Sequence, residues 1–81
     1  MGQKTKNVDL VGIVTAFDWD DNDKVNRVSL CVGDEEEYLI DDDKKGKELL
    51  KLLKSKVRAL GECYLDENKN LCLKLQQFTL L

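Results

Sequence analysis

The sequence predicts a mostly β domain of five strands and one helix, in the order β-β-β-α-β-β. Three observations support this fold class. Apolar and polar residues alternate in several stretches, turn-forming residues separate these stretches, and one segment repeats leucine with helical spacing. The chain has 81 residues, of which 42% are hydrophobic and 36% are charged. This length and composition fit one small globular domain.

The N-terminal third predicts a short leader followed by a first strand. Residues 1–7 are polar, so we expect a flexible leader there and a single domain over 8–81. The first strand is expected over 8–17, with Gly12 in its middle. A glycine inside a strand usually marks a bulge or a sharp bend. The strand ends at a turn signal over 18–23, which contains four aspartates.

Two further strands are expected before the helix. Over 25–32, valine and leucine alternate with more polar residues, which is typical of a strand with one buried face. Gly33 and Asp34 then suit a tight hairpin connection. The third strand is short, over 36–40, and its first residues are glutamates, as at a solvated edge.

A helix is expected between the third and fourth strands. Asp41, Asp42 and Asp43 precede it as N-cap candidates. At 100° per residue the following segment separates into an apolar face and a basic face. The apolar face holds Leu49, Leu50, Leu52 and Leu53, and the basic face holds Lys44, Lys47, Lys51 and Lys54.

The last two strands form a predicted hairpin. The fourth is expected over 57–65, with Gly61 in its middle, and the fifth over 71–80, after a polar loop at 66–70. Five strands and one short helix are too few for a two-layer sandwich of ordinary size. We therefore expect a closed or nearly closed Greek-key barrel, with the leucine face of the helix covering one end.

Four segments carry a resemblance to a known family. They are GIVTAF (12–17), VSL (28–30) with the following GD, GKELLKLL (46–53) and VRALGE (57–62). Through them the chain resembles small OB-fold domains, especially the anticodon-binding domains of aminoacyl-tRNA synthetases and related replication proteins. The resemblance implies a five-stranded OB-fold barrel that binds single-stranded DNA or RNA without catalysis.

The resemblance also implies where a ligand would bind. In the family, ligands cross the face made by the second and third strands. In this sequence that face would present Arg27, Ser29, Cys31 and Tyr38, with Phe17 and Trp19 at its rim, and the basic face of the helix would add its lysines. Aromatic side chains there would stack on bases, and basic side chains would contact phosphates. The candidate nucleic-acid contacts are Phe17, Trp19, Arg27, Ser29, Tyr38, Lys47, Lys51 and Lys54.

The charge distribution leaves alternatives open. Residues 44–58 carry seven basic side chains against one acidic side chain, a net charge of +6. The first 40 residues carry four basic and nine acidic side chains, a net charge of −5. The basic segment is either a patch for phosphates or an acidic partner, or an ordinary solvated helix face. Trp19 is likewise either a stacking platform or a side chain folded over the barrel rim.

The sequence contains no motif for catalysis. It has no histidine, no phosphate-binding glycine loop and no HExxH, so we expect neither an enzyme nor a bound cofactor. We expect no metal site either. Residues 18–22 resemble the start of a calcium loop, but Asp23 stands where that loop needs glycine and Ser29 where it needs glutamate. A solvated hairpin loop is the simpler interpretation.

The remaining expectations concern environment and partners. The three cysteines, Cys31, Cys63 and Cys72, are too widely spaced for a ligand pair and odd in number, so we expect reduced, mostly buried thiols. No apolar run is long enough to cross a membrane, and we expect a cytoplasmic protein without a membrane partner. The alternative function is a protein-interaction module or accessory subunit, which includes self-association through the acidic and basic regions.

Overall fold

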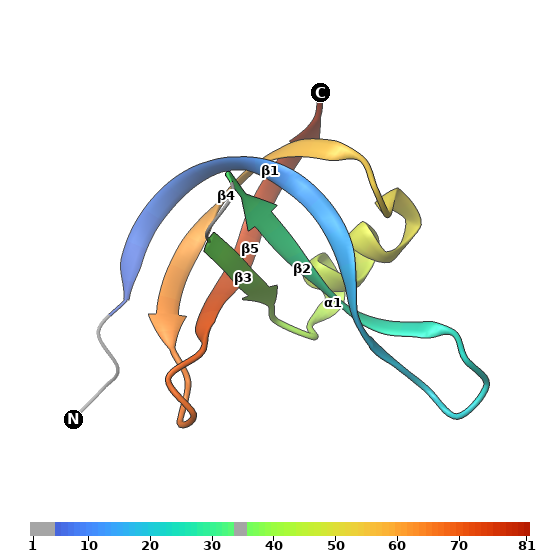
Figure 1. Cartoon of the computed structure of the whole chain (residues 1–81). Helices are drawn as coiled ribbons and strands as arrows, with labels where there is room; N and C mark the ends of the chain where they lie inside the picture. Colours follow the sequence, from blue (N-terminus) through green and yellow to red (C-terminus); the bar gives the residue numbers. More distant parts are fainter. Residues whose placement is uncertain (1–4, 34–35) are drawn as a thin grey trace.

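The computed structural model describes residues 5–33 and 36–81. Within this part of the chain, strands alternate with loops and with a single helical segment, which confirms the predicted mostly β class and element order (Figure 1). The elements are β1 (Lys6–Trp19), β2 (Val25–Val32), β3 (Glu36–Ile40), α1 (Lys44–Lys47), the 3-10 segment η1 (Glu48–Leu52), β4 (Lys56–Leu65) and β5 (Leu71–Leu80).

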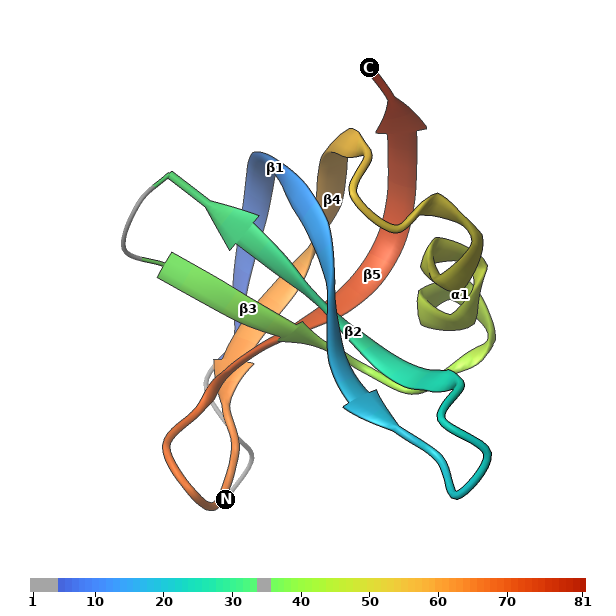
Figure 2. The ribbon, with the colours of Figure 1, turned by 45° about the vertical axis from the view of Figure 1, so that its right-hand side comes forward.

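The five strands close into a barrel in the order β1-β2-β3-β5-β4, with β4 returning to β1. The β3–β5 contact is parallel and joins Leu39 to Cys72 and Ile40 to Leu73, whereas the other pairings are antiparallel. Figure 2 shows the helical segment at one end of this barrel, next to β2 and β5. This small closed barrel, with its helix between β3 and β4, is consistent with an OB-fold.

Strand β1 pairs with two neighbouring strands of the barrel, β4 and β2. Its first part, Lys6–Ile13, pairs with β4, and from Ile13 onward it pairs with β2. Gly12 lies at this change of partner, and a Cβ there would collide with the carbonyl oxygen of Cys31. The glycine therefore permits the close backbone approach that the bend requires. The strand begins two residues before the expected Val8, and residues 1–4 of the predicted leader lie outside the described residues.

The predicted irregularity at Gly61 is confirmed. The β4–β5 register shifts between Leu60 and Gly61, which is a β-bulge. A Cβ on Gly61 would collide with the carbonyl oxygen of Lys74 on the neighbouring strand.

At the β2–β3 connection, Gly33 adopts a positive φ of 64°, as a turn glycine can. The predicted partner residue of that turn, Asp34, and the following Glu35 lie outside the described residues.

The helix is shorter and tighter than the sequence predicts. Of the three candidates, Asp43 is the N-cap, and its carboxylate accepts a hydrogen bond from the Gly46 amide at 2.8 Å. Only Lys44–Lys47 is α-helical, and the next turn is 3-10. The segment ends because Lys54 takes a positive φ of 68° and donates its amide to the Val14 carbonyl at 2.7 Å. This bond to β1 replaces a further helical bond.

The core fills the inside of the barrel with aliphatic side chains and one tyrosine. Leu49 of η1 is fully buried, so the leucine face covers one end of the barrel as expected, while Leu50, Leu52 and Leu53 are half-buried against the same core. Burial of this apolar area is the main stabilising contribution. The buried cluster is Val14, Val28, Leu30, Tyr38, Ile40, Leu49, Val57, Ala59, Leu73 and Leu75.

The cysteines form no disulfide. The expectation of free thiols agrees with this, but only Cys72 is buried, and Cys31 and Cys63 are half-buried. Burial raises the pKa of the Cys72 thiol, and the nearby Asp66 and Asp41 carboxylates raise it further. Cys72 is therefore held in the protonated form.

Stability is expected to fall in alkali because of Tyr38. Burial raises the pKa of Tyr38 to about 12, and its hydrogen bond to the Glu36 carboxylate adds to this shift. A raised pKa in the folded state favours the neutral phenol, so the stabilisation is full below about pH 10 and is lost as the pH rises toward 12. Urea unfolding at pH 9, 10 and 11 should show a falling free energy. Tyr38→Phe should reduce this dependence in part, since Tyr64, whose pKa burial also raises, remains; an unchanged slope in that variant would contradict the assignment.

Candidate functional site

A bulge in β1 places the two candidate aromatic residues on different sides of the β1–β2 hairpin. Ala16 pairs with Val28 and Asp18 with Arg27, which leaves Phe17 as the extra residue of the bulge, and Trp19 pairs with Val25. Cross-strand partners share a face of a sheet. Trp19 therefore lies on the side of Val25, whose side chain packs against the core.

Phe17 lies on the outer face of the barrel. There it lines a hollow of about 70 Å³ with Glu37, Leu39, Asn70 and Leu71. These residues come from β1, β3 and the start of β5, so the hollow forms where the parallel β3–β5 contact closes the barrel. The hollow therefore lies beside β3, at the edge of the face that the resemblance predicts as the ligand face, and both polar and apolar side chains line it.

Ser29 does not offer its hydroxyl to this face. The side chain is fully buried, and its Oγ donates to Glu37 Oε2 at 2.7 Å. Because that proton is used, the Thr15 hydroxyl is the donor in the 2.7 Å bond between Thr15 Oγ1 and Ser29 Oγ. These two hydrogen bonds, from Thr15 to Ser29 and from Ser29 to Glu37, fix the Glu37 carboxylate on the outer face. Ser29 therefore positions this carboxylate.

Tyr38 belongs to the core and not to the outer face. Its side chain is 7% exposed and packs in the buried cluster, and its hydroxyl donates to Glu36 Oε2 at 2.9 Å. The expectation that it lies on the ligand face is wrong. The pairing of Leu30 with Tyr38 gives the physical reason, because Leu30 points into the barrel and its cross-strand partner must do the same.

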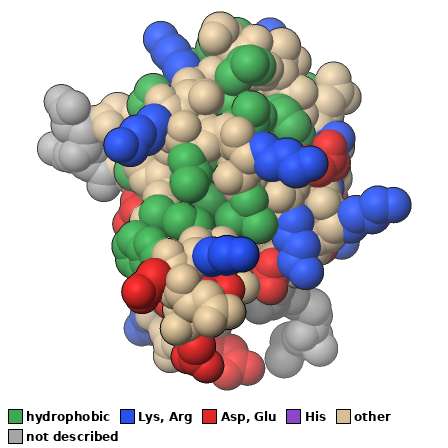
Figure 3. Space-filling model, turned by 90° about the vertical axis from the view of Figure 1, so that its right-hand side faces the viewer, with side chains coloured by type: hydrophobic (Ala, Val, Ile, Leu, Met, Phe, Trp, Pro, Cys, Tyr) green, Lys and Arg blue, Asp and Glu red, His purple; other side chains and the backbone are tan. Residues whose placement is uncertain are grey.

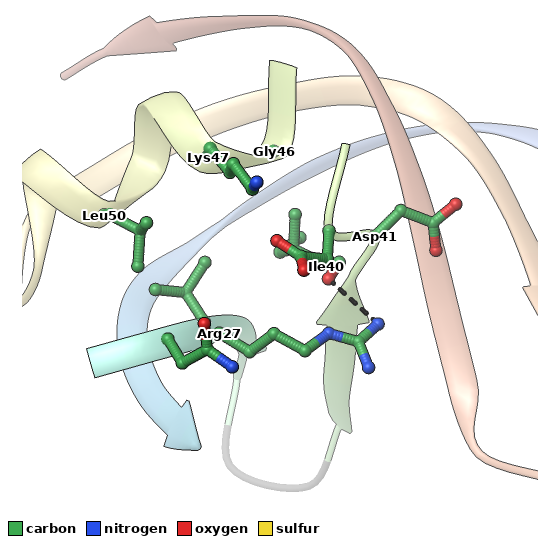
Figure 4. A pocket seen from close by; sticks show the side chains of 9 residues that line it. Arg27, Ile40, Asp41, Gly46, Lys47 and Leu50 are labelled. Atoms are coloured by element: carbon green, nitrogen blue, oxygen red, sulfur yellow. Dashed lines mark hydrogen bonds between the residues drawn. The ribbon is translucent and has the colours of Figure 1, made fainter. Parts of the chain in front are cut away.

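Arg27 is directed away from the hollow at Phe17. Its guanidinium donates through Nη2 to the Ile40 carbonyl at 3.4 Å, in a separate small recess that Asp41, Lys47 and Leu50 also line (Figure 4). Among the described residues, its Nε is a buried side-chain nitrogen without a hydrogen-bond partner. Arg27 thus connects β2 to the end of β3 and lies close to the helix.

Sequence reasoning missed an aromatic residue on the β4–β5 side of the barrel. Tyr64 is half-buried, pairs with Cys72 across the two strands, and donates its hydroxyl to Asp41. Burial raises the pKa of Tyr64, and the hydrogen bond to Asp41 raises it further. Alternation along 57–65 is the available signal, because it sets Tyr64 opposite in phase to the buried Val57 and Ala59.

The two loops that flank the β2–β3 face are acidic. In the β4–β5 loop, Asp66 accepts hydrogen bonds from the amides of Asn68 and Asn70 at 2.8 and 2.9 Å. The backbone bond from Asn70 is the main cause that lowers the pKa of Asp66. Asp66 therefore stays ionised, and with Glu37 it gives this side of the barrel a negative potential.

The helix side of the molecule is basic, in contrast to the acidic side at the β2–β3 face. Leu50 is half-buried there, and Lys47, Lys51 and Lys54 are exposed. Figure 3 shows this side, where a band of hydrophobic side chains has basic side chains around it and acidic ones toward one end. Of the eight candidate contacts, the structure brings Lys47 and Arg27 together at the recess of Figure 4 and leaves Phe17 on the outer face.

Comparison of the chain with family models, with curated proteins and with solved structures gives no match in any of the three. Over residues 5–33 and 36–81, no cluster of histidine, cysteine, aspartate or glutamate has the arrangement of a metal site. In the same part of the chain, no helix is long and apolar enough to span a bilayer. The geometry of the two faces is therefore the basis for a functional proposal.

Proposed function

We propose that this chain is a non-catalytic binding module for single-stranded nucleic acid, DNA or RNA. The observation that carries the proposal is Trp19, whose indole is 53% exposed on the same side of the hairpin as Val25. Single strands require a stacking platform and a positive surface; Trp19 offers the first, and the lysine-rich segment over 44–58 offers the second. The OB-like barrel supports the same class of function.

The proposed path of the nucleic-acid strand follows from the charged side chains on the two faces of the barrel. The outer β2–β3 face carries the fixed carboxylate of Glu37, and the flanking β4–β5 loop carries that of Asp66; both repel phosphates. The helix side carries Lys47 and Lys51, which are exposed and follow one another at an interval of four residues. We therefore place the bases on Trp19 and the phosphates along these lysines.

Binding should be visible in the fluorescence of Trp19, because it is the only tryptophan of the chain. Titration with a short oligothymidylate or oligouridylate at about 50 mM salt should quench this fluorescence, and binding should weaken steeply with added salt. Stacking on an aromatic side chain contributes about 1–3 kcal/mol per base. Trp19→Leu, followed by anisotropy of a labelled oligonucleotide, should thus bind roughly five- to a hundredfold more weakly.

The lysines have a matched control in the same chain. Lys47→Ala with Lys51→Ala should make the plot of log affinity against log salt shallower by about 1.4, since each phosphate contact on a single strand contributes about 0.7. Lys6→Ala with Lys74→Ala removes the same charge from exposed positions on β1 and β5. Equal effects of the two double variants, or no quenching at high micromolar protein, would contradict the proposal.

A further inference from the structure

The hollow at Phe17 is lined by both apolar side chains and polar groups. Phe17, Leu39 and Leu71 supply the apolar surface, and Glu37 and Asn70 supply the polar groups. Leu39 is only 6% exposed and forms the bottom of the hollow, whereas Phe17 is 43% exposed and lies at its open edge. Such a surface suits a ligand group that has both an apolar stem and a polar head.

The carboxylate of Glu37 is held in place with one oxygen free. Ser29 Oγ, at 2.7 Å, and the Cys31 thiol, at 4.0 Å, both approach Oε2. Oε1 has no hydrogen-bond or ion-pair partner among residues 5–33 and 36–81. A fixed carboxylate with a free oxygen favours a cationic hydrogen-bond donor.

Glu37 is the one charged side chain that lines the hollow among the described residues, and it forms no ion pair there. The ion pairs of the described residues are Lys45–Glu48 and Arg58–Asp9, and neither includes Glu37 or Asp66. Asp66, at the start of the loop that carries Asn70, is kept ionised by its backbone hydrogen bonds. A cation entering the hollow would therefore meet no repulsion from a lining side chain.

The size of the hollow limits the group that enters it. About 70 Å³ corresponds to roughly five to seven water-sized positions. This space accepts the head and last methylenes of one long side chain, but it does not enclose a nucleobase with its sugar.

We propose that this hollow binds an arginine or lysine side chain from a basic segment of a partner protein. The methylenes lie on Leu39 and Leu71, and the cationic head lies between Glu37 Oε1 and the ring of Phe17, where charge pairing and cation–π attraction act together. This site is separate from the nucleic-acid surface at Trp19, and it does not depend on the proposed function.

The probe for this site is a fluorescein-labelled peptide of alternating arginine and serine, with a citrulline–serine peptide as the neutral counterpart. In fluorescence anisotropy at about 100 mM salt, the arginine peptide should bind and the citrulline peptide should not. Glu37→Gln should weaken binding about fivefold or more, because a charge-assisted bond becomes a neutral one while Ser29 keeps an acceptor. Phe17→Ser, at an exposed position, should weaken binding without any change of charge.

The control is Glu48→Gln, which removes the same charge from the exposed pair on the helix side. It should leave the affinity within about twofold of the parent protein. Equal weakening by Glu48→Gln and Glu37→Gln would overturn the proposal, since binding would then follow overall charge. Equal binding of the citrulline peptide, or no binding of the arginine peptide, would overturn it as well.

Discussion

Replacing Leu30 with alanine is expected to lower the free energy of unfolding by about 3–5 kcal/mol. Leu30 is fully buried in the centre of β2 and belongs to the cluster that fills the barrel. The truncation removes buried apolar area and leaves a cavity, because strands joined on both sides cannot collapse into it. In a domain this small, such a loss is a large part of the total stability.

Urea unfolding followed by circular dichroism measures this effect. Leu80→Ala is the matched control, since it makes the same chemical change at a side chain that is 56% exposed. The control should cost less than about 1 kcal/mol. Similar losses for the two variants would show that Leu30 is not at the centre of the core.

The second large effect is expected at Gly12. Alanine there should destabilise the barrel by about 2 kcal/mol or more, because its Cβ would collide with the Cys31 carbonyl on β2 and would also approach the Leu30 side chain at 3.1 Å. Backbone on a paired strand cannot move aside as a flexible side chain can. The bend of β1, which allows it to pair with both β4 and β2, would be strained.

Gly33→Ala distinguishes this collision from a general cost of losing a glycine. Gly33 has open space around a Cβ, and its cost comes only from its positive φ of 64°, at about 1–2 kcal/mol. Thermal and urea unfolding of both variants should show the larger loss for Gly12→Ala. A loss below about 0.5 kcal/mol for Gly12→Ala would contradict the close approach of β1 and β2.

Local sequence signals predicted most of the fold. The alternation over 25–32 places Val28 and Leu30 inside the barrel, and the aspartates before the helix include its N-cap, Asp43. The helix was the weaker case, because its wheel pattern does not distinguish α from 3-10 geometry. The helical segment ends where the Lys54 amide donates to the carbonyl oxygen of Val14, which lies forty residues earlier in the chain.

The candidate site was harder to predict because it depends on register between distant segments. Nothing local marks Phe17 as the bulged residue, yet the bulge decides that Phe17 and Trp19 lie on different sides. The two exposed glutamates at the start of β3 obscure its inside–outside alternation, so the sequence predicts Tyr38 on the ligand face, whereas the structure buries it in the core. Asn70 and Leu71 reach the hollow only because β5 closes against β3.

The central claim is that nucleic acid binds along the helix side at Trp19 and not across the acidic β2–β3 face. An amide-shift titration of the labelled protein with a short oligothymidylate at about 50 mM salt tests it most directly. The account predicts shifts of the Trp19 indole N–H and of the amides of Val25, Lys47 and Leu50, with Leu39 and Leu71 unchanged. Shifts centred on Leu39 and Leu71, or none at any position, would contradict it.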